Sequence, residues 1–290
     1  MDVVGVRRFN RMVTQRVGAL QEDYLARGRP LGEDRVLWEI GAEGCDVRTL
    51  RARLDLDSGY LSRLLRSLTS AGLVQVEPSA ADARVRMARL TKKGLAERRV
   101  LDARSDELAA SILEPLDERQ RARLTAAMDE VTRLLTASMV RVEIVDPRLP
   151  VAQYCLNAYF EELGRRFETG FDPARSISAD HAELTLPAGL LLVATLRSEP
   201  VGCGALKLHG SEPAEIKRMW VSPDARGLGL GRRLLAELEG TAAAHGATAV
   251  RLETNHNLNE AIALYRSAGF KEVPAFNTEP YAHHWFEKPL

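Results

Sequence analysis

Apolar residues recur at helical spacing through most of the first 140 positions and alternate at strand spacing in much of the remainder. Steps of three and four over residues 3–25 predict an amphipathic helix, which the glycine and proline of residues 28–30 interrupt. Further helices are predicted over residues 32–41, 47–54, 58–71 and 118–140. Residues 73–78 and 85–91 predict two short strands around a turn-rich tip at 79–84. The first half is therefore expected to be mainly α, with one hairpin.

The helix predicted from Ser58 to Ala71 has two distinct faces. At 100° per residue its leucines form one stripe that faces a core, and serine and arginine side chains lie opposite. Asp57 or Ser58 can cap its start, and Gly72 follows its end. Two helices joined by a tight turn, the second with a Ser/Arg outer face, are typical of a helix-turn-helix that enters the major groove of DNA. With the basic hairpin that follows as a wing, the candidate DNA-binding residues are Ser58, Tyr60, Ser62, Arg63, Arg66, Asp82, Arg84 and Arg86.

Charge supports that interpretation locally. The 290-residue chain has 40 basic and 40 acidic side chains and no formal net charge. Residues 46–100, however, contain 12 basic and 6 acidic side chains. A local excess of positive charge attracts a phosphate backbone.

The segment "LSRLLRSLTSAGLVQVEPSAADARVRMARLTKKG" resembles the winged-helix core of the MarR family of bacterial regulators. The resemblance covers about residues 5–140. It implies binding to double-stranded DNA, with Asp82 orienting an arginine, and dimerisation through the first and last helices. The last helix has a seam of apolar residues close to a coiled-coil repeat, and Asp117 with Gln120 can cap its start. Because one winged helix reads few base pairs, we expect a homodimer on a palindromic operator. The seam consists of Leu124, Met128, Val131, Leu135 and Met139.

The pattern changes near residue 141, which predicts two domains, 1–140 and 141–290. Strands are predicted at 140–145, 215–221, 249–254 and 283–290, with an antiparallel hairpin at 189–196 and 201–208. A helix-rich segment around 159–167 and helices at 230–244 and 259–269 complete an α/β layout, a mixed sheet covered by helices.

The run "RGLGLG" at residues 226–231 lies between a predicted strand and a predicted helix. Its spacing excludes the dinucleotide fingerprint, which needs a third glycine where Arg232 or Leu234 stands, and no Walker lysine follows. Backbone N–H groups of glycines at a helix N-terminus still form an anion-binding nest.

Residues 142–290 resemble the GNAT N-acetyltransferase superfamily, through the Arg-x-x-Gly-x-Gly loop and the later "NEAIALYRSAGF". The resemblance implies a splayed mixed sheet and acetyl-CoA as co-substrate. The loop would bind the pyrophosphate, the strand before it the pantetheine and thioester, Asn259 the pantetheine arm, and Tyr265 would lie near the thioester sulfur. The implied cofactor-binding residues are Met219, Val221, Arg226, Gly227, Leu228, Gly229, Leu230, Gly231, Arg232, Asn259 and Tyr265.

Direct transfer to an amine needs an oxyanion donor, an acid and a base. The backbone N–H of Val221 suits the oxyanion, and Tyr265 suits an acid towards a leaving thiolate. Two residues are candidates for the general base, Glu215 and Glu253. By the strand period of two, Glu215 is predicted to share a face with Lys217, Met219 and Val221.

Fewer sequence features indicate the acceptor site than the cofactor site. His283 and His284 are either a solvated or packed pair or part of the acceptor pocket. Arg218 and the segment 160–167 can meet an anionic acceptor such as an amino-acid carboxylate. Adjacent histidines point to opposite sides of an extended chain, so no metal site is expected.

Cysteine content and hydropathy limit the cellular context. Cys45, Cys155 and Cys203 form no close pair and are expected to be buried free thiols. The chain start lacks a signal-peptide pattern, and the longest apolar run, at 186–196, is about half a bilayer span. A cytoplasmic protein without membrane contact is expected.

Together these patterns predict a MarR-like winged helix fused to a GNAT-like domain. The leading hypothesis is a bifunctional regulator that binds an operator and acetylates a small amine or amino-acid-like acceptor. The alternative is a regulator whose second domain senses acetyl-CoA or a ligand without turnover. A third is an enzyme whose winged helix serves only dimerisation.

Overall fold

The computed structural model describes residues 2–20, 24–79, 82–177 and 179–290. The chain divides into two compact units, Met1–Met128 and Asp129–Leu290, and the division falls inside one helix, α6 (Glu118–Ser138). The domain boundary at residues 140/141 stays a prediction. No helix in the described ranges is long and apolar enough to cross a bilayer.

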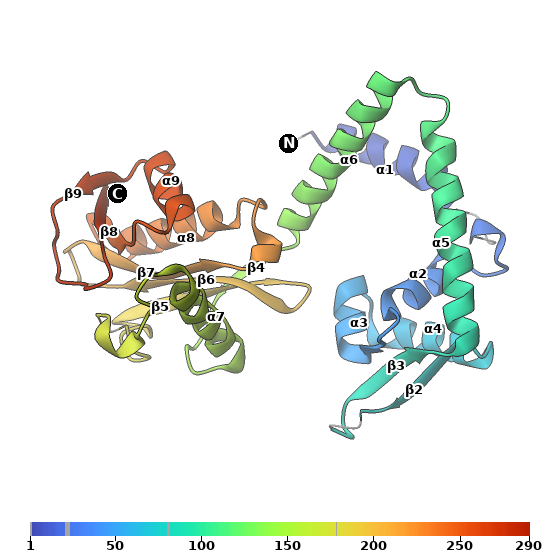
Figure 1. Cartoon of the computed structure of the whole chain (residues 1–290), viewed down its shortest axis with the longest axis horizontal. Coiled ribbons are helices and arrows are strands. Elements are labelled where there is room, and N and C mark those ends of the chain that lie inside the picture. Colours follow the sequence, from blue (N-terminus) through green and yellow to red (C-terminus); the bar gives the residue numbers. More distant parts are fainter. Residues whose placement is uncertain (1, 21–23, 80–81, 178) are drawn as a thin grey trace. The chain divides into compact units, whose positions relative to one another are not determined.

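The first unit is a winged helix, as predicted (Figure 1). Its three-stranded sheet has the order β1-β3-β2, and β2 and β3 form the wing hairpin. The two-residue strand β1 was not predicted, because only its pairing with β3 defines it. The elements are α1 (Val3–Arg16), η1 (Tyr24–Ala26), α2 (Leu31–Ile40), β1 (Cys45–Asp46), α3 (Val47–Leu54), α4 (Ser58–Ser70), β2 (Val74–Pro78), β3 (Arg86–Leu90) and α5 (Lys92–Leu113).

The helix α4 buries the predicted leucine stripe. Its four leucines pack with α2 and the sheet in one core, and Asp57 caps the helix by accepting a hydrogen bond from the Tyr60 N–H at 2.8 Å. Gly72 takes the left-handed conformation, φ +73°, that ends the helix. The buried leucines of α4 are Leu61, Leu64, Leu65 and Leu68.

The helices α1 and α6 bury no residue within the described chain. The helix α1 is shorter than predicted and ends at Arg16, because Gly18 at φ +73° turns the chain out of the helix. Residues 21–23 lie outside the described ranges. The start of α6 has the predicted reciprocal cap: Gln120 N–H donates to Asp117 Oδ1 at 2.8 Å, and Asp117 N–H donates to Gln120 Oε1 at 3.0 Å.

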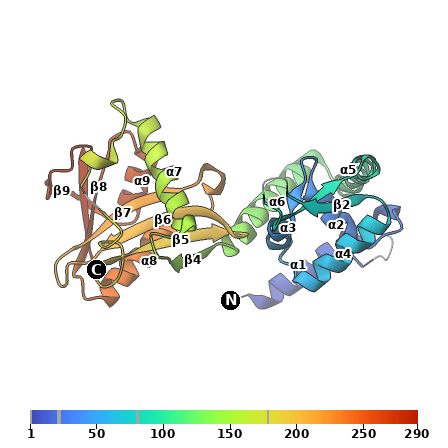
Figure 2. The same cartoon turned by 90° about the horizontal axis from the view of Figure 1, so that it is seen from below.

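The second unit is a seven-stranded mixed sheet of order β4-β5-β6-β7-β8-β10-β9. Only the pair β7·β8 is parallel. The helices α7 and α8 cover opposite faces of the sheet (Figure 2). The elements are β4 (Arg141–Ile144), α7 (Pro150–Arg166), η2 (Pro173–Arg175), β5 (Gly189–Leu196), β6 (Glu199–Lys207), β7 (Ala214–Val221), η3 (Pro223–Ala225), α8 (Leu230–Ala244), β8 (Ala249–Thr254), α9 (Asn259–Ser267), β9 (Lys271–Val273) and β10 (His284–Pro289).

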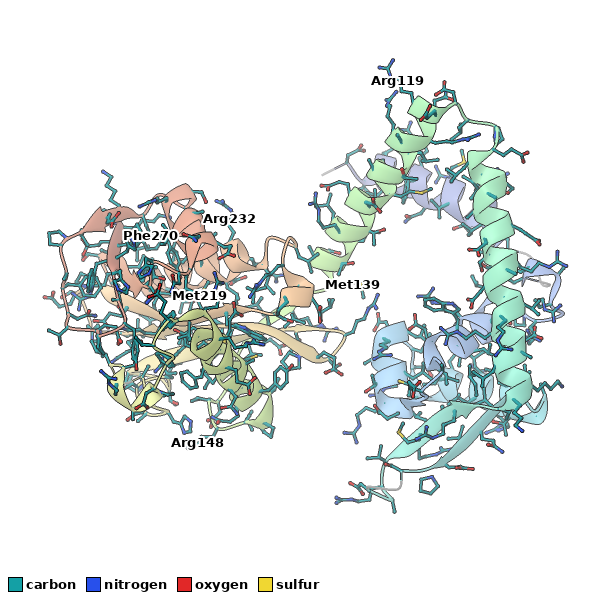
Figure 3. The ribbon with its side chains drawn as sticks, viewed as in Figure 1. Arg119, Met139, Arg148, Met219, Arg232 and Phe270 are labelled. Atoms are coloured by element: carbon teal, nitrogen blue, oxygen red, sulfur yellow. The ribbon has the colours of Figure 1, made fainter. Side chains whose placement is uncertain are left out.

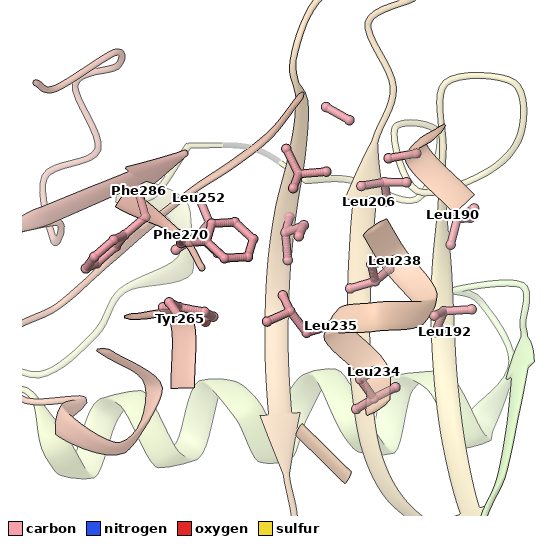
Figure 4. Close-up of a cluster of buried hydrophobic side chains, with 14 of the residues drawn as sticks. Leu190, Leu192, Leu206, Leu234, Leu235, Leu238, Leu252, Tyr265, Phe270 and Phe286 are labelled. Atoms are coloured by element: carbon pink, nitrogen blue, oxygen red, sulfur yellow. The ribbon is translucent and has the colours of Figure 1, made fainter. Parts of the chain in front are cut away.

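Each face of the sheet has its own core. On one face, leucines of α8 pack on β5 and β6 and continue to Tyr265, Phe270 and Phe286 (Figure 4). On the other, Cys155 of α7 packs against Cys203 of β6 and its neighbours. All three cysteines are buried, as predicted, and none of them forms a disulfide with another.

A β-bulge interrupts β7. Lys217 pairs with Ala205 and Trp220 with Cys203, so two residues of β7 lie opposite one of β6. Arg218 in the bulge has φ +55°. The predicted common face is therefore wrong: Glu215 and Lys217 lie on the α7 face, whereas Met219 and Val221 pack on the α8 face.

The strands β7 and β8 pair only at Ala214↔Val250 and Glu215↔Arg251. Beyond these residues the two strands diverge. The splayed sheet is thus confirmed, and the opening lies beside the bulge.

Candidate functional site

Two adjoining cavities occupy the opening between β7 and β8. The first, here the loop cavity, is bordered by the glycine run and by Arg166, Arg226 and Arg232. The second, here the aromatic cavity, is bordered by Phe167, Phe171, Tyr281 and charged side chains of β7 and β8. The residues that border both cavities are here called the shared wall. It consists of Tyr159, Leu163, Met219, Leu258, Ala261 and Tyr265.

The glycine run turns the chain from β7 into α8. Gly227 and Gly229 have φ of +81° and +74°, which favours glycine, and Gly229 caps α8 without a side chain. The first-turn amides of α8 have no acceptor within the helix, so they face outward as donors. Helix dipole and free amides together make this end of α8 an anion site.

Three arginines border the loop cavity, and two of them are held by carboxylates. Arg226 donates to both oxygens of Glu162, at 2.6 and 2.7 Å, and Arg166 pairs with Glu162 and Glu260. Arg232, labelled in Figure 3, differs from the other two. Its side chain donates only to Ser267 and has no carboxylate partner among the described residues. Arg232 is therefore available to an anion at the helix start.

Most of the predicted cofactor residues meet in the loop cavity. Leu228 packs against the core instead, and Asn259 is exposed at the start of α9 and borders neither cavity. Glu162 and Arg166 belong to the segment 160–167 predicted for the acceptor, and their place beside the glycine run was not predicted, because only the fold brings α7 to the loop. The predicted residues that border the loop cavity are Met219, Val221, Arg226, Gly227, Gly229, Leu230, Gly231, Arg232 and Tyr265.

The backbone of β7 offers a donor to the opening. The Ser222 N–H donates to Val201 O of β6 at 2.9 Å. Since N–H directions alternate along an antiparallel strand, the Val221 N–H points away from β6, towards the side from which β8 has diverged. This amide has the direction that an oxyanion donor requires.

Two tyrosines lie in the shared wall, Tyr265 buried and Tyr159 half-buried. Burial raises the pKa of Tyr265, and the charges of Tyr159 and Glu253 raise it further. Burial also raises the pKa of Tyr159 to about 12, although Arg218 beside its hydroxyl opposes the rise. Both phenols are therefore protonated at neutral pH. Tyr159 was not predicted as a site residue.

The two candidate bases differ in position. Glu253 borders the aromatic cavity and accepts hydrogen bonds from Lys217 Nζ and from Asn277 Nδ2. Glu215 borders neither cavity and pairs with Arg251 at 2.7 Å. Burial raises the pKa of Glu215, but Arg251 and Lys217 outweigh it and hold the pKa below its ordinary value. Only Glu253 is thus within reach of an occupant.

The histidine pair lies outside both cavities. The ring of His283 contacts that of His256, with centroids 4.2 Å apart, and His284 Nδ1 lies 2.6 Å from Glu272 Oε1. The neighbours Tyr281 and Ala282 border the aromatic cavity instead.

The predicted DNA-binding residues gather on one side of the first unit. Ser58, Ser62, Arg84 and Arg86 border a hollow between α3, α4 and the wing, which Arg48 and Arg51 of α3 also border. These α3 residues were not predicted.

Other predicted residues lie beside this hollow. Tyr60, Arg63 and Arg66 are exposed on α4. Asp82 accepts hydrogen bonds from the backbone N–H and the guanidinium of Arg84, at 3.0 and 3.1 Å, and these bonds lower the pKa of Asp82. The wing aspartate therefore orients an arginine.

Comparisons with known proteins agree with both units. Residues 156–270 match the acetyltransferase (GNAT) family and residues 30–85 the MarR family. An IAA acetyltransferase of Azospirillum brasilense is 38% identical over 135 residues, 45% of this chain and 87% of that protein. A putative acyl-CoA N-acyltransferase from Klebsiella pneumoniae is 29% identical, covering 52% of this chain and 98% of its own, with a TM-score of 0.43. The PcaV transcriptional regulator from Streptomyces coelicolor is 25% identical, covering 44% and 88%, with a TM-score of 0.35.

Proposed function

Since this chain belongs to the GNAT acetyltransferase family and also contains a MarR-family region, we propose that it binds operator DNA and transfers an acetyl group from acetyl-CoA to a small amine or amino-acid-like acceptor. The observation that carries the enzymatic part is the pair of adjoining cavities with Tyr265 in their shared wall. Two substrates can meet there.

The loop cavity fits acetyl-CoA. The outward amides of the α8 start and the carboxylate-free Arg232 suit the pyrophosphate, and the backbone of Met219 and Val221 suits the pantetheine arm. When bound, acetyl-CoA supplies an activated acetyl group as a thioester. Asn259, exposed and outside the cavity lining, contacts the arm only if the ligand extends to the start of α9.

Side chains that border the two cavities supply the proton transfers. Glu253, directly or through water, takes a proton from the acceptor ammonium, and the Val221 N–H stabilises the developing oxyanion. Tyr265, protonated because burial raises its pKa, gives a proton to the departing thiolate. Glu215 remains the other predicted base, and it acts only through the Lys217–Glu253 pair.

The first unit supplies the DNA-binding surface. The α4 residues Ser62, Arg63 and Arg66 face the major groove, and the Asp82–Arg84 pair directs the wing towards the backbone or minor groove. The binding partner is a palindromic operator, because the protein acts as a homodimer.

Exposed apolar residues of α1 and α6 support the homodimer. Phe9, Met12 and Val13 of α1 are exposed, as are Met128 and Leu135 of the predicted seam, and neither helix buries a residue within its own chain. Apolar surface of this kind is typical of a partner interface.

One experiment separates the proposed function from its alternative. The full-length protein, acetyl-CoA and a panel of amines are incubated, and free CoA thiol and acetylated products are measured. Release of CoA that depends on acceptor and falls in the Tyr265→Phe variant supports the enzyme. Operator binding that responds to acetyl-CoA, with no product from any amine, supports the sensor instead.

A further inference from the structure

Three aromatic rings form one wall of the aromatic cavity. Phe167 at the end of α7, Phe171 in the next loop and Tyr281 before β10 are in mutual contact, with centroid distances of 4.9 to 5.9 Å. The Tyr281 hydroxyl accepts a hydrogen bond from the Asp172 N–H at 3.0 Å, which fixes this ring. Flat, fixed rings suit an aromatic or large apolar group on the occupant.

Two cations border the same cavity, and only one is neutralised. Lys217 is held by Glu253 and, at 3.5 Å, by Glu215. Arg218 has no carboxylate partner among the described residues, and its guanidinium lies 4.8 Å from the ring centre of Phe160. A guanidinium oriented by a ring and free of acidic partners is suited to bind a carboxylate through two parallel hydrogen bonds.

The β7 bulge decides where that guanidinium lies. Arg218 has φ +55°, a conformation that a residue with a side chain rarely adopts. It immediately precedes Met219, which belongs to the shared wall. Because Arg218 and Met219 are adjacent, an anion bound by Arg218 lies close to the shared wall that also borders the loop cavity.

We propose that the acceptor is an α-amino acid with an aromatic or large apolar side chain. Arg218 binds its carboxylate, the wall of Phe167, Phe171 and Tyr281 holds its side chain, and its amine faces the shared wall. The inference rests on the acetyl transfer proposed above. It specifies which amine is the substrate.

The reaction balances as an amide-forming transfer. The acceptor ammonium loses one proton, and its nitrogen forms a bond to the thioester carbonyl carbon. The carbon–sulfur bond then breaks, the thiolate takes a proton from Tyr265, and the nitrogen loses its second proton, which restores the phenol of Tyr265. The products are the N-acetyl amino acid, CoA thiol and one proton.

The test compares acceptors that differ from phenylalanine either in the carboxylate or in the side chain. Phenylalanine, phenylalaninamide, phenethylamine and glycine are each incubated with the full-length protein and acetyl-CoA, and CoA release and acetylated product are quantified. We expect kcat/KM for phenylalanine to exceed that for phenethylamine and glycine by about 10²-fold or more. In Arg218→Gln we expect the preference for the carboxylate to disappear, with Arg218→Lys intermediate.

The matched control is Arg175→Gln. Arg175 lies 6.0 Å from the ring centre of Tyr281 but is exposed and outside the cavity lining, so its removal should leave the preference unchanged. Acetylation of phenethylamine as fast as phenylalanine overturns the amino-acid proposal and leaves acetyl transfer standing. Absence of CoA release with every amine, including a wider panel, overturns both.

Discussion

Single residues in the shared wall owe their chemistry to burial. Tyr265 is surrounded by Phe270, Phe286 and the α8 leucines, so its phenol cannot ionise readily and remains a proton donor. The prediction that Tyr265 lies near the thioester sulfur rests on sequence resemblance. The contribution of Tyr159, by contrast, depends on α7 lying across the opening, which no local pattern indicates.

Removing the Tyr265 hydroxyl should slow the transfer without weakening cofactor binding. We expect Tyr265→Phe to lower kcat by about 10²-fold, the usual range for a general acid, with KM for acetyl-CoA nearly unchanged. Steady-state CoA release gives both constants. Tyr154→Phe, an exposed tyrosine of α7, is the control. A large change in KM alone would assign Tyr265 to binding.

One glutamate should make the stability of the first unit depend on acid pH. Arg27 and Arg29 pair with Glu97 at 2.7 and 2.6 Å, and these hydrogen bonds outweigh burial and lower its pKa to about 2 from 4.5. Because the folded pKa is depressed, the stabilisation is complete above pH 4.5 and is lost as the pH falls towards about 2.

The variant Glu97→Gln should therefore lower the free energy of unfolding by about 2 kcal/mol at pH 7 and by much less near pH 2.5. Hydrogen exchange of α2 and α5 across this pH range measures the effect. Glu107→Gln on the same helix, whose side chain is 67% exposed, should change stability little. A Glu97→Gln loss that stays constant with pH would contradict the ion-pair explanation.

At the scale of elements, the sequence predicted those features that depend on one helix or strand alone. The leucine stripe of α4, the reciprocal cap of α6 and the helix from Leu230 to Ala244 all depend on neighbouring residues in the sequence, and each is confirmed. The bulge at Arg218 depends on the register between β6 and β7. The period of two therefore failed at the position that determines which side chains face the cavity.

The loop-to-helix junction before α8 should tolerate no side chain at Gly229. Its φ of +74° disfavours any L-residue, and the strain shifts the amides that suit the pyrophosphate. We expect Gly229→Val to raise KM for acetyl-CoA by about tenfold, as 1.4 kcal/mol implies. Gly240→Ala, in the exposed middle of the same helix, should leave KM unchanged and slightly raise stability. Equal KM values for acetyl-CoA in both variants would contradict a role of the loop in cofactor binding.

For the whole molecule, the two proposed activities use residues of different units. The α4 arginines belong to Met1–Met128, whereas both cavities belong to Asp129–Leu290. The division itself could be inferred from a change in periodicity. The aromatic cavity could not, because its lining comes from residues 159–177 and 216–282, which only the folded sheet and its covering segments unite.

Because the two proposed activities use separate surfaces, a substitution in one surface should impair one activity and leave the other unchanged. We expect Arg63→Ala with Arg66→Ala to weaken operator binding and to flatten its logarithmic salt dependence by about 0.9 for each phosphate that the variant no longer neutralises. Arg119→Ala on α6 is the control for charge. Acetyl transfer should be unchanged in all of them, and Tyr265→Phe should retain DNA affinity. If the arginine substitutions leave DNA affinity unchanged at every salt concentration, a winged helix used only for dimerisation is favoured.

The six-residue wall common to both cavities has a consequence for inhibition. Occupants of the two cavities would contact the same six residues, so we expect one molecule to be able to reach both cavities. An amino acid joined through its nitrogen, by a short acyl linker, to the sulfur of CoA has that form. Because its second half binds at the high effective concentration set by the linker, such a bisubstrate compound should bind far more tightly than either half.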